Sequence, residues 1–339
     1  YYNQYVAANP EPMVGIGLKH VNLKEASAAL QAHAQPEISA PTKQDLKENL
    51  AQLEDTAFVH LHNHSQFSVL QSTMSVKDLV AQAAKHNMPA VALTDHANLM
   101  GAFHFVKEVK GHNARIKQAH KEAEEAGTPK EGSIMTPIVG CEFFVCEDHT
   151  NKNVKDYGYQ MVFLAKNKKG YHNLAKLSSI AYTKGFYYVP RIDKALVEQY
   201  KEDLIVLSGN MYGEVAAKIL NTGETQAEEA LLWWKDTFGP DFYVELMRHQ
   251  QEDEDRVNQV LVPMAQKHGV SLVASNNTYY AAQKDAEAHD ILLCVKDGEK
   301  QATPIGRGRG YRYGLPNQEY YFKSAAEMKS LFSDLPEAI

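Results

Sequence analysis

The amino-acid sequence predicts an α/β fold, because apolar, β-branched segments alternate with helical periodicity over roughly 240 residues. Seven such strands imply parallel β-α units, which either close into a barrel or form an open, doubly wound sheet. No glycine-rich phosphate-binding loop follows the first strand, which counts against a dinucleotide-binding sheet. We therefore expect a barrel, with its functional residues at the carboxyl ends of the strands.

The strand candidates are apolar runs bounded by turn residues, at 58–62, 90–94, 137–145, 159–165, 204–208, 242–246 and 271–275. Helical spacing of apolar residues predicts the intervening helices, at 76–87, 171–182, 214–220, 255–268 and 285–295. Trp233 and Trp234 fall in a further helical stretch, where tryptophan more often belongs to the core than to a ligand site. The acidic run 251–255 is expected to be the solvated first turn of a helix.

Residues 1–56 differ from the rest of the chain, because their second half is rich in Ala, Gln, Glu and Lys. Asn22 and Thr42 are candidate caps for two short helices, which would end near residues 33 and 54. We interpret this part as a helical linker, and a small subdomain packed on the main fold is the alternative. The predicted domains are therefore an N-terminal extension, 1–56, and a barrel, 57–339. Both ends of the chain are expected to be cuts in a longer protein.

Composition excludes several classes of protein. The 35 basic and 42 acidic residues give a net charge of −7, which disfavours free-standing, non-specific binding of nucleic acid. No run of about 18 apolar residues is present, so we expect no membrane partner. Three cysteines form no disulfide or metal pattern and suit a reducing cytoplasm. Histidine is concentrated, since eight of the 15 lie between His60 and His120.

Histidine and acidic residues gather where the first three predicted strands end. His62 and His64 share one face of the first strand, because strand residues two apart point the same way. Two histidines at this spacing can reach one metal ion without bending the backbone. His96 and Glu142, from the next two strands, would complete a His, His, His, Glu cluster. Two neighbours are further candidates: His60 on the same face, and Asp95, which could instead cap a helix or orient a histidine.

The motifs around these residues resemble the polymerase and histidinol phosphatase (PHP) domain family. The two strongest matches are FVHLHNHSQFS at 58–68 and MPAVALTDHANL at 88–99. Further matches follow in the family's order, at 137–142, 170–174, 190–193, 207–209 and 319–328. The resemblance covers about residues 57–339 and is most specific to the PHP domains of bacterial DNA polymerase III alpha subunits. It implies a distorted (β/α)7, TIM-like barrel. The alternative is a stand-alone metallophosphatase. The PRID motif at 190–193 argues against it, because it resembles the polymerase branch of the family.

The resemblance also implies a ligand set. PHP domains with phosphoesterase activity hold a cluster of up to three metal ions, and His62, His64, His96 and Glu142 match ligand positions of that cluster. Five other ligand positions carry side chains that supply neither a carboxylate, a thiolate nor an imidazole, namely Gln71, Gln160, Asn210, Asn277 and Tyr279.

The loss of these ligands predicts a change of function. A centre with two or three metal ions needs several anionic ligands to offset the repulsion between the ions. We therefore expect a catalytically silent domain with a structural or docking role, and we assign no catalytic residue. It would bind no cofactor, or at most one Zn or Mn ion. The alternative is a residual metal-dependent 3′–5′ exonuclease or phosphoesterase, acting in proofreading or pyrophosphate hydrolysis.

The resemblance implies a parent protein that is a DNA-directed DNA polymerase, a nucleotidyltransferase that extends DNA from deoxynucleoside triphosphates. Its Mg²⁺ would be held by a palm domain beyond residue 339, towards which 286–339 leads. The expected partners are DNA, deoxynucleoside triphosphates, the other polymerase domains and a proofreading exonuclease, either fused upstream or separate.

A glycine- and arginine-rich segment, 306–314, is a second candidate site. Arginine can pair with phosphate and tyrosine can stack on bases. We therefore expect Arg307, Arg309 and Arg312 to contact DNA or a neighbouring polymerase domain. A solvated loop between a helix and the last strand is the equal alternative.

Overall fold

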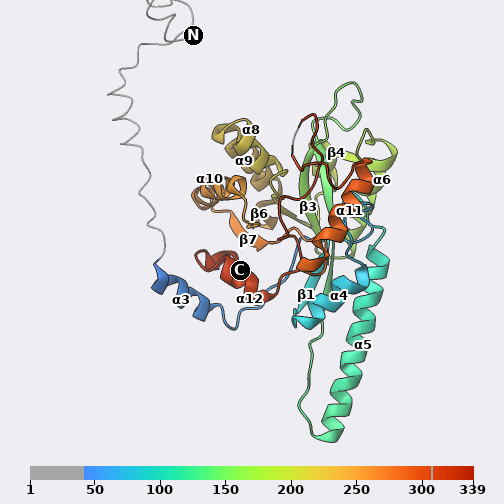
Figure 1. The fold of residues 1–339 in the computed structure, drawn as a ribbon, viewed down its shortest axis with the longest axis vertical. Helices are drawn as coiled ribbons and strands as arrows, with labels where there is room; N and C mark the ends of the chain where they lie inside the picture. The colour runs from blue at the N-terminus through green and yellow to red at the C-terminus, as the bar shows by residue number, and fades with distance from the viewer. Residues whose placement is uncertain (1–41, 307) are drawn as a thin grey trace, which may run out of the picture. The chain divides into compact units, whose positions relative to one another are not determined.

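The computed structural model describes residues 42–306 and 308–339 (Figure 1). Residues 45–339 form one compact unit, which contains the whole sheet. The helix predicted from Asn22 lies outside the described residues.

Seven strands form one curled sheet (Figure 1). Its strand order is β1-β2-β3-β5-β6-β7, and β4 pairs with the far end of β2. The strands are β1 (Ala90–Leu93), β2 (Thr136–Cys146), β3 (Tyr159–Ala165), β4 (Arg191–Asp193), β5 (Leu204–Leu207), β6 (Phe242–Met247) and β7 (Ser271–Ser275).

The sheet is mixed, so the expectation of parallel units throughout is wrong for one strand. β3 runs antiparallel to both β2 and β5, whereas the other pairs are parallel. The reason is the connection from β2 to β3. It spans 147–158 without a helix, and parallel neighbours need a long crossover.

The segment 58–64, which contains the first predicted strand, closes the barrel without forming a regular strand, and is called the closing segment below. The backbone carbonyls of His60 and Asn63 accept hydrogen bonds from β1 and the residue after it. On the other side, His64 donates to the carbonyl of Thr278 just after β7, and Thr278 donates back to that of His62. This segment therefore bridges the two edges of the sheet. The α/β class and the distorted, TIM-like barrel predicted from the sequence are confirmed.

Helices surround the sheet (Figure 1). The five predicted helices appear as α4, α6, α8, α10 and α11, and the additional helices include α5, which projects away from the barrel. The helices are α3 (Lys43–Gln52), α4 (Val76–Lys85), α5 (Ala102–Ala126), α6 (Lys168–Thr183), α7 (Lys194–Tyr200), α8 (Glu214–Asn221), α9 (Glu224–Phe238), α10 (Glu252–His268), α11 (Ala286–Asp297) and α12 (Ala325–Leu331). Short 3-10 turns lie at η1 (Gly239–Asp241), η2 (Gln283–Asp285) and η3 (Pro336–Ala338). None of the described helices has the length and apolar character that a membrane crossing requires.

The core lies between the sheet and its helices. Trp234 of α9 is fully buried against Phe163 and Phe242, while its indole Nε1 donates to Glu214 Oε2 at 2.8 Å. A buried indole needs such a partner, because an unpaired N–H in the core is costly. Trp234 is therefore a core residue, as expected, and Trp233 is only partly buried.

The segment before the barrel packs on the C-terminal end of the same unit. Asn49 Nδ2 donates to the carbonyl of Ser333 at 2.8 Å, and Leu53 is buried. Lys329 Nζ donates to the carbonyl of Glu54 at 2.9 Å. These contacts hold residues 45–54 on the barrel, and the domain boundary at residue 56 stays a prediction.

Candidate functional site

Three histidines converge on one buried glutamate. His62 and His64 come from the segment that closes the barrel, His96 follows β1, and Glu142 lies in β2. His62 Nε2 lies 3.3 Å from Glu142 Oε1, while His64 Nε2 and His96 Nδ1 lie 3.0 and 2.6 Å from Oε2. The four side chains are almost completely shielded from solvent. The structure therefore brings together the four residues that match the family's ligand positions.

Each histidine turns its other ring nitrogen towards an outer partner. His62 Nδ1 lies 3.0 Å from Glu245 Oε1, and His64 Nδ1 lies 3.3 Å from the carbonyl of Thr278. His96 Nε2 lies 3.5 Å from the Tyr279 hydroxyl. Outer partners of this kind orient histidines that bind metal ions.

Glu245 was missed by the sequence analysis. It lies in the middle of β6, in the apolar run FYVELM, and is buried beside His62. The available signal was its charge, because a glutamate is almost never fully buried unless it is paired. Its Oε2 has no hydrogen-bond partner among the described residues.

His60 does not join the cluster, although it was expected on the same face. Its Nε2 donates to the carbonyl of Lys323 at 2.7 Å, and its ring packs against Phe58 and Phe322. Burial lowers the pKa of His60 to about 4, so the ring is neutral. His60 is a packing residue of the core.

Asp95 forms hydrogen bonds with a loop, and neither orients a histidine nor caps a helix. Its carboxylate accepts hydrogen bonds from the backbone and hydroxyl of Ser65, at 2.7 and 2.8 Å, and from the Ser68 hydroxyl at 2.7 Å. Three donors occupy most of its accepting capacity. The next helix, α5, is instead preceded by Gly101. Asp95 thus positions the loop that follows His64.

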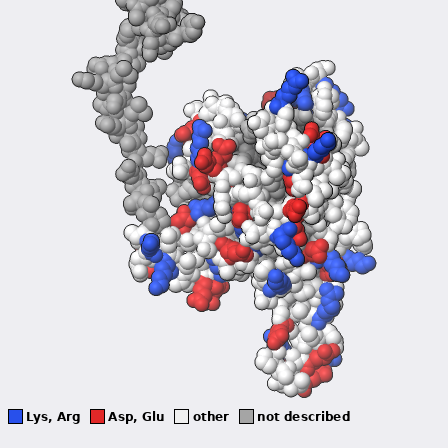
Figure 2. Space-filling view, in the orientation of Figure 1, with Lys and Arg blue, Asp and Glu red and all other residues white. Residues whose placement is uncertain are grey.

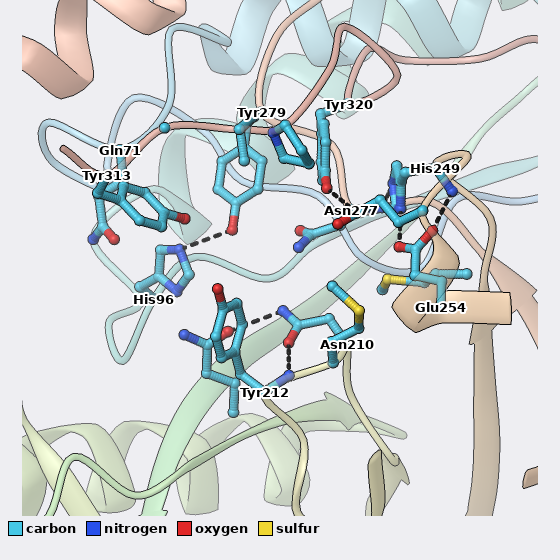
Figure 3. Close-up of a pocket in the computed structure, with 17 residues that line it drawn as sticks. Gln71, His96, Asn210, Tyr212, His249, Glu254, Asn277, Tyr279, Tyr313 and Tyr320 are labelled. Carbon is cyan, nitrogen blue, oxygen red and sulfur yellow. Dashed lines mark hydrogen bonds and ion pairs between the residues drawn. The ribbon is translucent and has the colours of Figure 1, made fainter. Parts of the chain in front are cut away.

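The five substituted ligand positions line one pocket beside the cluster (Figure 3). Asn210 Nδ2 donates to Gln160 Oε1 at 2.9 Å and reaches Glu142 Oε1 at 3.3 Å. The ring of Tyr279 stacks on His64, with the centroids 4.4 Å apart. Neutral amides and a phenol therefore occupy the side of Glu142 where the family carries further ligands. The positions that line the pocket are Gln71, Gln160, Asn210, Asn277 and Tyr279.

The opposite wall holds a second buried pair, seen on the right of Figure 3. His249 Nδ1 lies 2.6 Å from Glu254 Oε1, and His249 Nε2 accepts a hydrogen bond from the backbone of Asn277 at 3.3 Å. The expectation that the acidic run is solvated is therefore wrong for Glu254, which turns inward to pair with His249. The two residues are only five positions apart, but the sequence did not show which of the acidic residues 252–255 turns inward.

The charges of the cluster compensate one another. Burial alone would raise the pKa of the Glu142 carboxyl, but the imidazoles of His96 and His62 hold it well below its usual range. Burial alone would lower the pKa of His62, but Glu245 and Glu142 outweigh it and raise that pKa to about 10. Burial and the neighbouring His96 lower the pKa of His64 to about 3. His62 is thus an imidazolium held between two carboxylates.

These shifts predict a stability maximum near pH 6.5. The pKa of His62 is raised above its usual 6.5, so its contribution is present below that pH and lost as the pH rises towards 10. The pKa values of His60 and His64 are lowered, so their contribution is lost as the pH falls below 6.5. From pH 7 to 8.5, the free energy of unfolding should fall by on the order of 1 kcal/mol per pH unit.

Urea unfolding at several pH values measures this dependence. His62→Gln should flatten the alkaline side of the profile and leave the acid side in place. A free energy of unfolding that rises from pH 7 to 8.5 would contradict the assignment of charge to His62.

The donor set fits one metal ion. Among the described residues, His62 Nε2 and His96 Nδ1 are buried without a hydrogen-bond partner, although both face Glu142. The ligand atoms of His62, His64 and Glu142 all lie within 4.8 Å of one another. Imidazole nitrogens and carboxylate oxygens are both ligands that zinc takes, usually four at a time. A second or third ion does not fit, because the remaining positions are neutral amides and a phenol.

The structure corrects the expectation for Arg312. Its guanidinium is 5% exposed and forms a bidentate pair with Asp290 of α11, at 2.6 and 2.8 Å. It also donates to the carbonyl of Thr303 at 2.9 Å. This charge is neutralised within the chain, so Arg312 anchors the loop. Arg309 is exposed, and Arg307 lies outside the described residues.

Comparisons with known proteins agree with these motifs. Residues 60–249 match the PHP domain. The DNA polymerase III subunit alpha of Borreliella burgdorferi is 40% identical over 288 residues, which cover 83% of this chain and 23% of the relative. Those of Chlamydia muridarum and Treponema pallidum are 35% and 34% identical, over 83% and 84% of this chain and 23% and 22% of theirs. The chain thus spans less than a quarter of the length of these relatives.

Two solved structures are more distant. An amidohydrolase from Chromobacterium violaceum has a TM-score of 0.40 and 12% identity, over 66% of this chain and 88% of its own. A putative metal-dependent phosphoesterase from Bifidobacterium adolescentis has a TM-score of 0.38 and 13% identity, over 76% of this chain and 93% of its own. Likenesses at this level carry no argument about function.

Proposed function

Because the chain belongs to the PHP domain family, we propose that it is the PHP domain of a DNA polymerase III alpha subunit and is itself catalytically silent. Its role would be structural, as a docking module for the other parts of the polymerase. The proposal includes a domain boundary near residue 56 and a place in the cytoplasm.

One observation carries this proposal. Five of the family's ligand positions are neutral, and all five line the same pocket beside Glu142. Asn210, hydrogen-bonded to Gln160 and Glu142, directs an amide donor to where a hydrolytic centre would need a further anionic ligand. The imidazolium of His62 already balances Glu142 and Glu245. The site is therefore electrostatically complete without a cluster of ions.

A single Zn or Mn ion remains compatible with this role. His62, His64, His96 and Glu142 would hold it. Such an ion supplies Lewis acidity and a bound water of lowered pKa. In this chain it would mainly cross-link the closing segment, β1 and β2 and so stabilise the barrel.

The parent protein's activity is part of the proposal. It would extend DNA from deoxynucleoside triphosphates with Mg²⁺ held outside this chain. Its partners would be DNA, the other polymerase domains and a proofreading exonuclease. Within the segment 306–314, Arg309 is the described arginine that is exposed. It would make the contact with DNA or with a neighbouring polymerase domain.

A second candidate function is a residual metal-dependent 3′–5′ exonuclease or phosphoesterase. Two nitrogens, His62 Nε2 and His96 Nδ1, favour it: they form no hydrogen bond within the described residues and face Glu142, so a metal ion that displaced the proton of His62 could bind between them. The open pocket next to them could admit a phosphate ester.

A hydrolysis assay separates the two candidates. The purified chain, with Mn²⁺ or Zn²⁺ added, would be given a labelled single-stranded oligonucleotide and, separately, a chromogenic phosphomonoester. We expect wild type and His64→Ala to show the same background. Turnover that is lost in His64→Ala and in the milder His96→Gln, but kept in the surface variant Lys168→Gln, would show that the domain is an enzyme and would contradict the silent-domain proposal.

A further inference from the structure

Two loops beyond the sheet are joined by one buried arginine. Arg191 begins β4 and is completely buried. Its guanidinium donates to the carbonyl of Gly185 at 3.1 Å in one loop, and to those of Asp156 and Asn151 in the other, at 3.0 and 2.9 Å. The loop 147–158 and the segment 185–190 are therefore fixed to each other, and the surface they form is pre-organised.

Aromatic side chains stand exposed on these two loops. Tyr157 and Tyr188 are 46% and 58% exposed, and their rings lie edge to face with centroids 5.9 Å apart. Phe186, 48% exposed, stacks on Tyr182 in the same region. Large exposed aromatic groups lose the benefit of burial, so a cluster of them on rigid loops points to a binding surface.

Tyr188 adds a backbone signal. It lies at the tip of a tight turn closed by a hydrogen bond from Tyr187 to Val189, and its φ is 63°. A bulky residue rarely adopts this left-handed conformation, which costs of order 1–3 kcal/mol. The turn holds the ring of Tyr188 outward next to Tyr157.

The surface also carries positive charge that forms no ion pair with a carboxylate within the described residues. Lys155 Nζ lies over the rings of Tyr157 and Tyr188, at 5.1 and 4.9 Å from their centroids. In the part of the chain that the structure describes, neither Lys155, which contacts the two tyrosine rings, nor the exposed Lys184 near Phe186 forms an ion pair with a carboxylate. The loop 147–158 also carries three acidic residues: Asp156 accepts hydrogen bonds from backbone N–H groups of the loop, Asp148 accepts from Thr150, and Glu147 is exposed.

We propose that the surface formed by Lys155, Tyr157, Phe186 and Tyr188 binds single-stranded nucleic acid. Tyr157 and Tyr188 would stack on successive bases, and Lys155 would contact the intervening phosphate. Rings with a cation between them suit a base and its phosphate better than an apolar peptide, which gains nothing from the ammonium group. The net charge of −7 does not prevent such a contact, since exposed charges are screened beyond about 8 Å at physiological salt. This function lies beyond the structural role proposed above and does not require the metal site.

Fluorescence anisotropy of a labelled oligothymidylate of about 15 nucleotides tests the proposal at about 50 mM salt. Wild type should bind with a Kd of about 10⁻⁴ M or tighter. Tyr157→Ala and Tyr188→Asn should each weaken binding at least about fivefold, and asparagine tolerates the left-handed backbone at 188. Lys155→Gln should weaken binding and reduce its salt dependence.

Matched controls lie at the other end of α6. Tyr171→Ala and Lys168→Gln remove an exposed tyrosine and an exposed lysine away from this surface, and should leave the Kd unchanged. Photocrosslinking of wild type with a thiothymidine oligonucleotide should label the loop 147–158 or the segment 185–190, whatever the stability of the variants. Three results would overturn the proposal: no saturable binding of the oligothymidylate, equally tight binding of a double-stranded oligonucleotide of the same length, or equal effects of the binding-surface variants and the control variants.

Discussion

Replacing Glu142 with alanine should reduce the free energy of unfolding at pH 7 by about 3–5 kcal/mol. The carboxylate is fully buried and lies against three imidazoles, one of which is charged. Removing it leaves that charge with Glu245 alone and opens space between the closing segment and β2. Urea unfolding followed by circular dichroism measures the loss.

Glu228→Ala is the matched control. Glu228 accepts from Lys267 and His268 on the surface, and its loss should change stability far less than the loss of Glu142, because solvent screens such pairs. Glu142→Gln keeps the volume of the side chain and separates the loss of charge from the loss of packing. If Glu142→Ala lowered the free energy of unfolding no more than Glu228→Ala, the ion pairs of Glu142 with the histidines would not stabilise the barrel.

Replacing Arg191 with alanine should cost at least about 3 kcal/mol, because several buried carbonyls lose their donor at once. Arg191→Lys should recover only part of this, since an ammonium cannot reproduce the planar fork of donors. Urea unfolding followed by circular dichroism measures both changes in the free energy of unfolding. The variant should also expose the loop 147–158 to limited proteolysis, because the guanidinium fixes it to the segment 185–190.

Arg248 provides the comparison for Arg191. It forms a bidentate pair with Asp334, but both side chains are partly solvent-exposed, and Arg248→Ala should cost less than about 1 kcal/mol. An Arg191→Lys variant as stable as wild type, with unchanged proteolysis of the loop, would show that the two loops hold together without the guanidinium.

Regular strands and amphipathic helices could be predicted where burial follows a simple period. β3 occupies 159–165, as predicted, because it is a continuous apolar run between polar turns. α5 was missed because only Ala102, Phe105 and Val109 are buried, so most of its length has no apolar stripe. The segment 58–62 has the composition of a strand, yet it pairs with its neighbours at isolated points.

The site could be located from the sequence, but its electrostatics could not. Alternating histidines and the family motifs led to His62, His64, His96 and Glu142, which the barrel brings together. The pair His62–Glu245 depends on which strands become neighbours, whereas His249 and Glu254 are only five residues apart and pair at the turn into α10. Arg312 was interpreted as a surface cation because local sequence cannot show that Asp290 lies opposite it.

In this account, His62, His64, His96 and Glu142 balance their charges together with Glu245 and form no centre with two or three metal ions. Metal content per chain, measured by inductively coupled plasma mass spectrometry after incubation with Zn²⁺ or Mn²⁺ and removal of free ions, tests it most directly. We predict at most one ion per chain, absent from a His62→Gln/His96→Gln variant that is still folded. Two or more ions per chain, lost together in that variant, would contradict the account.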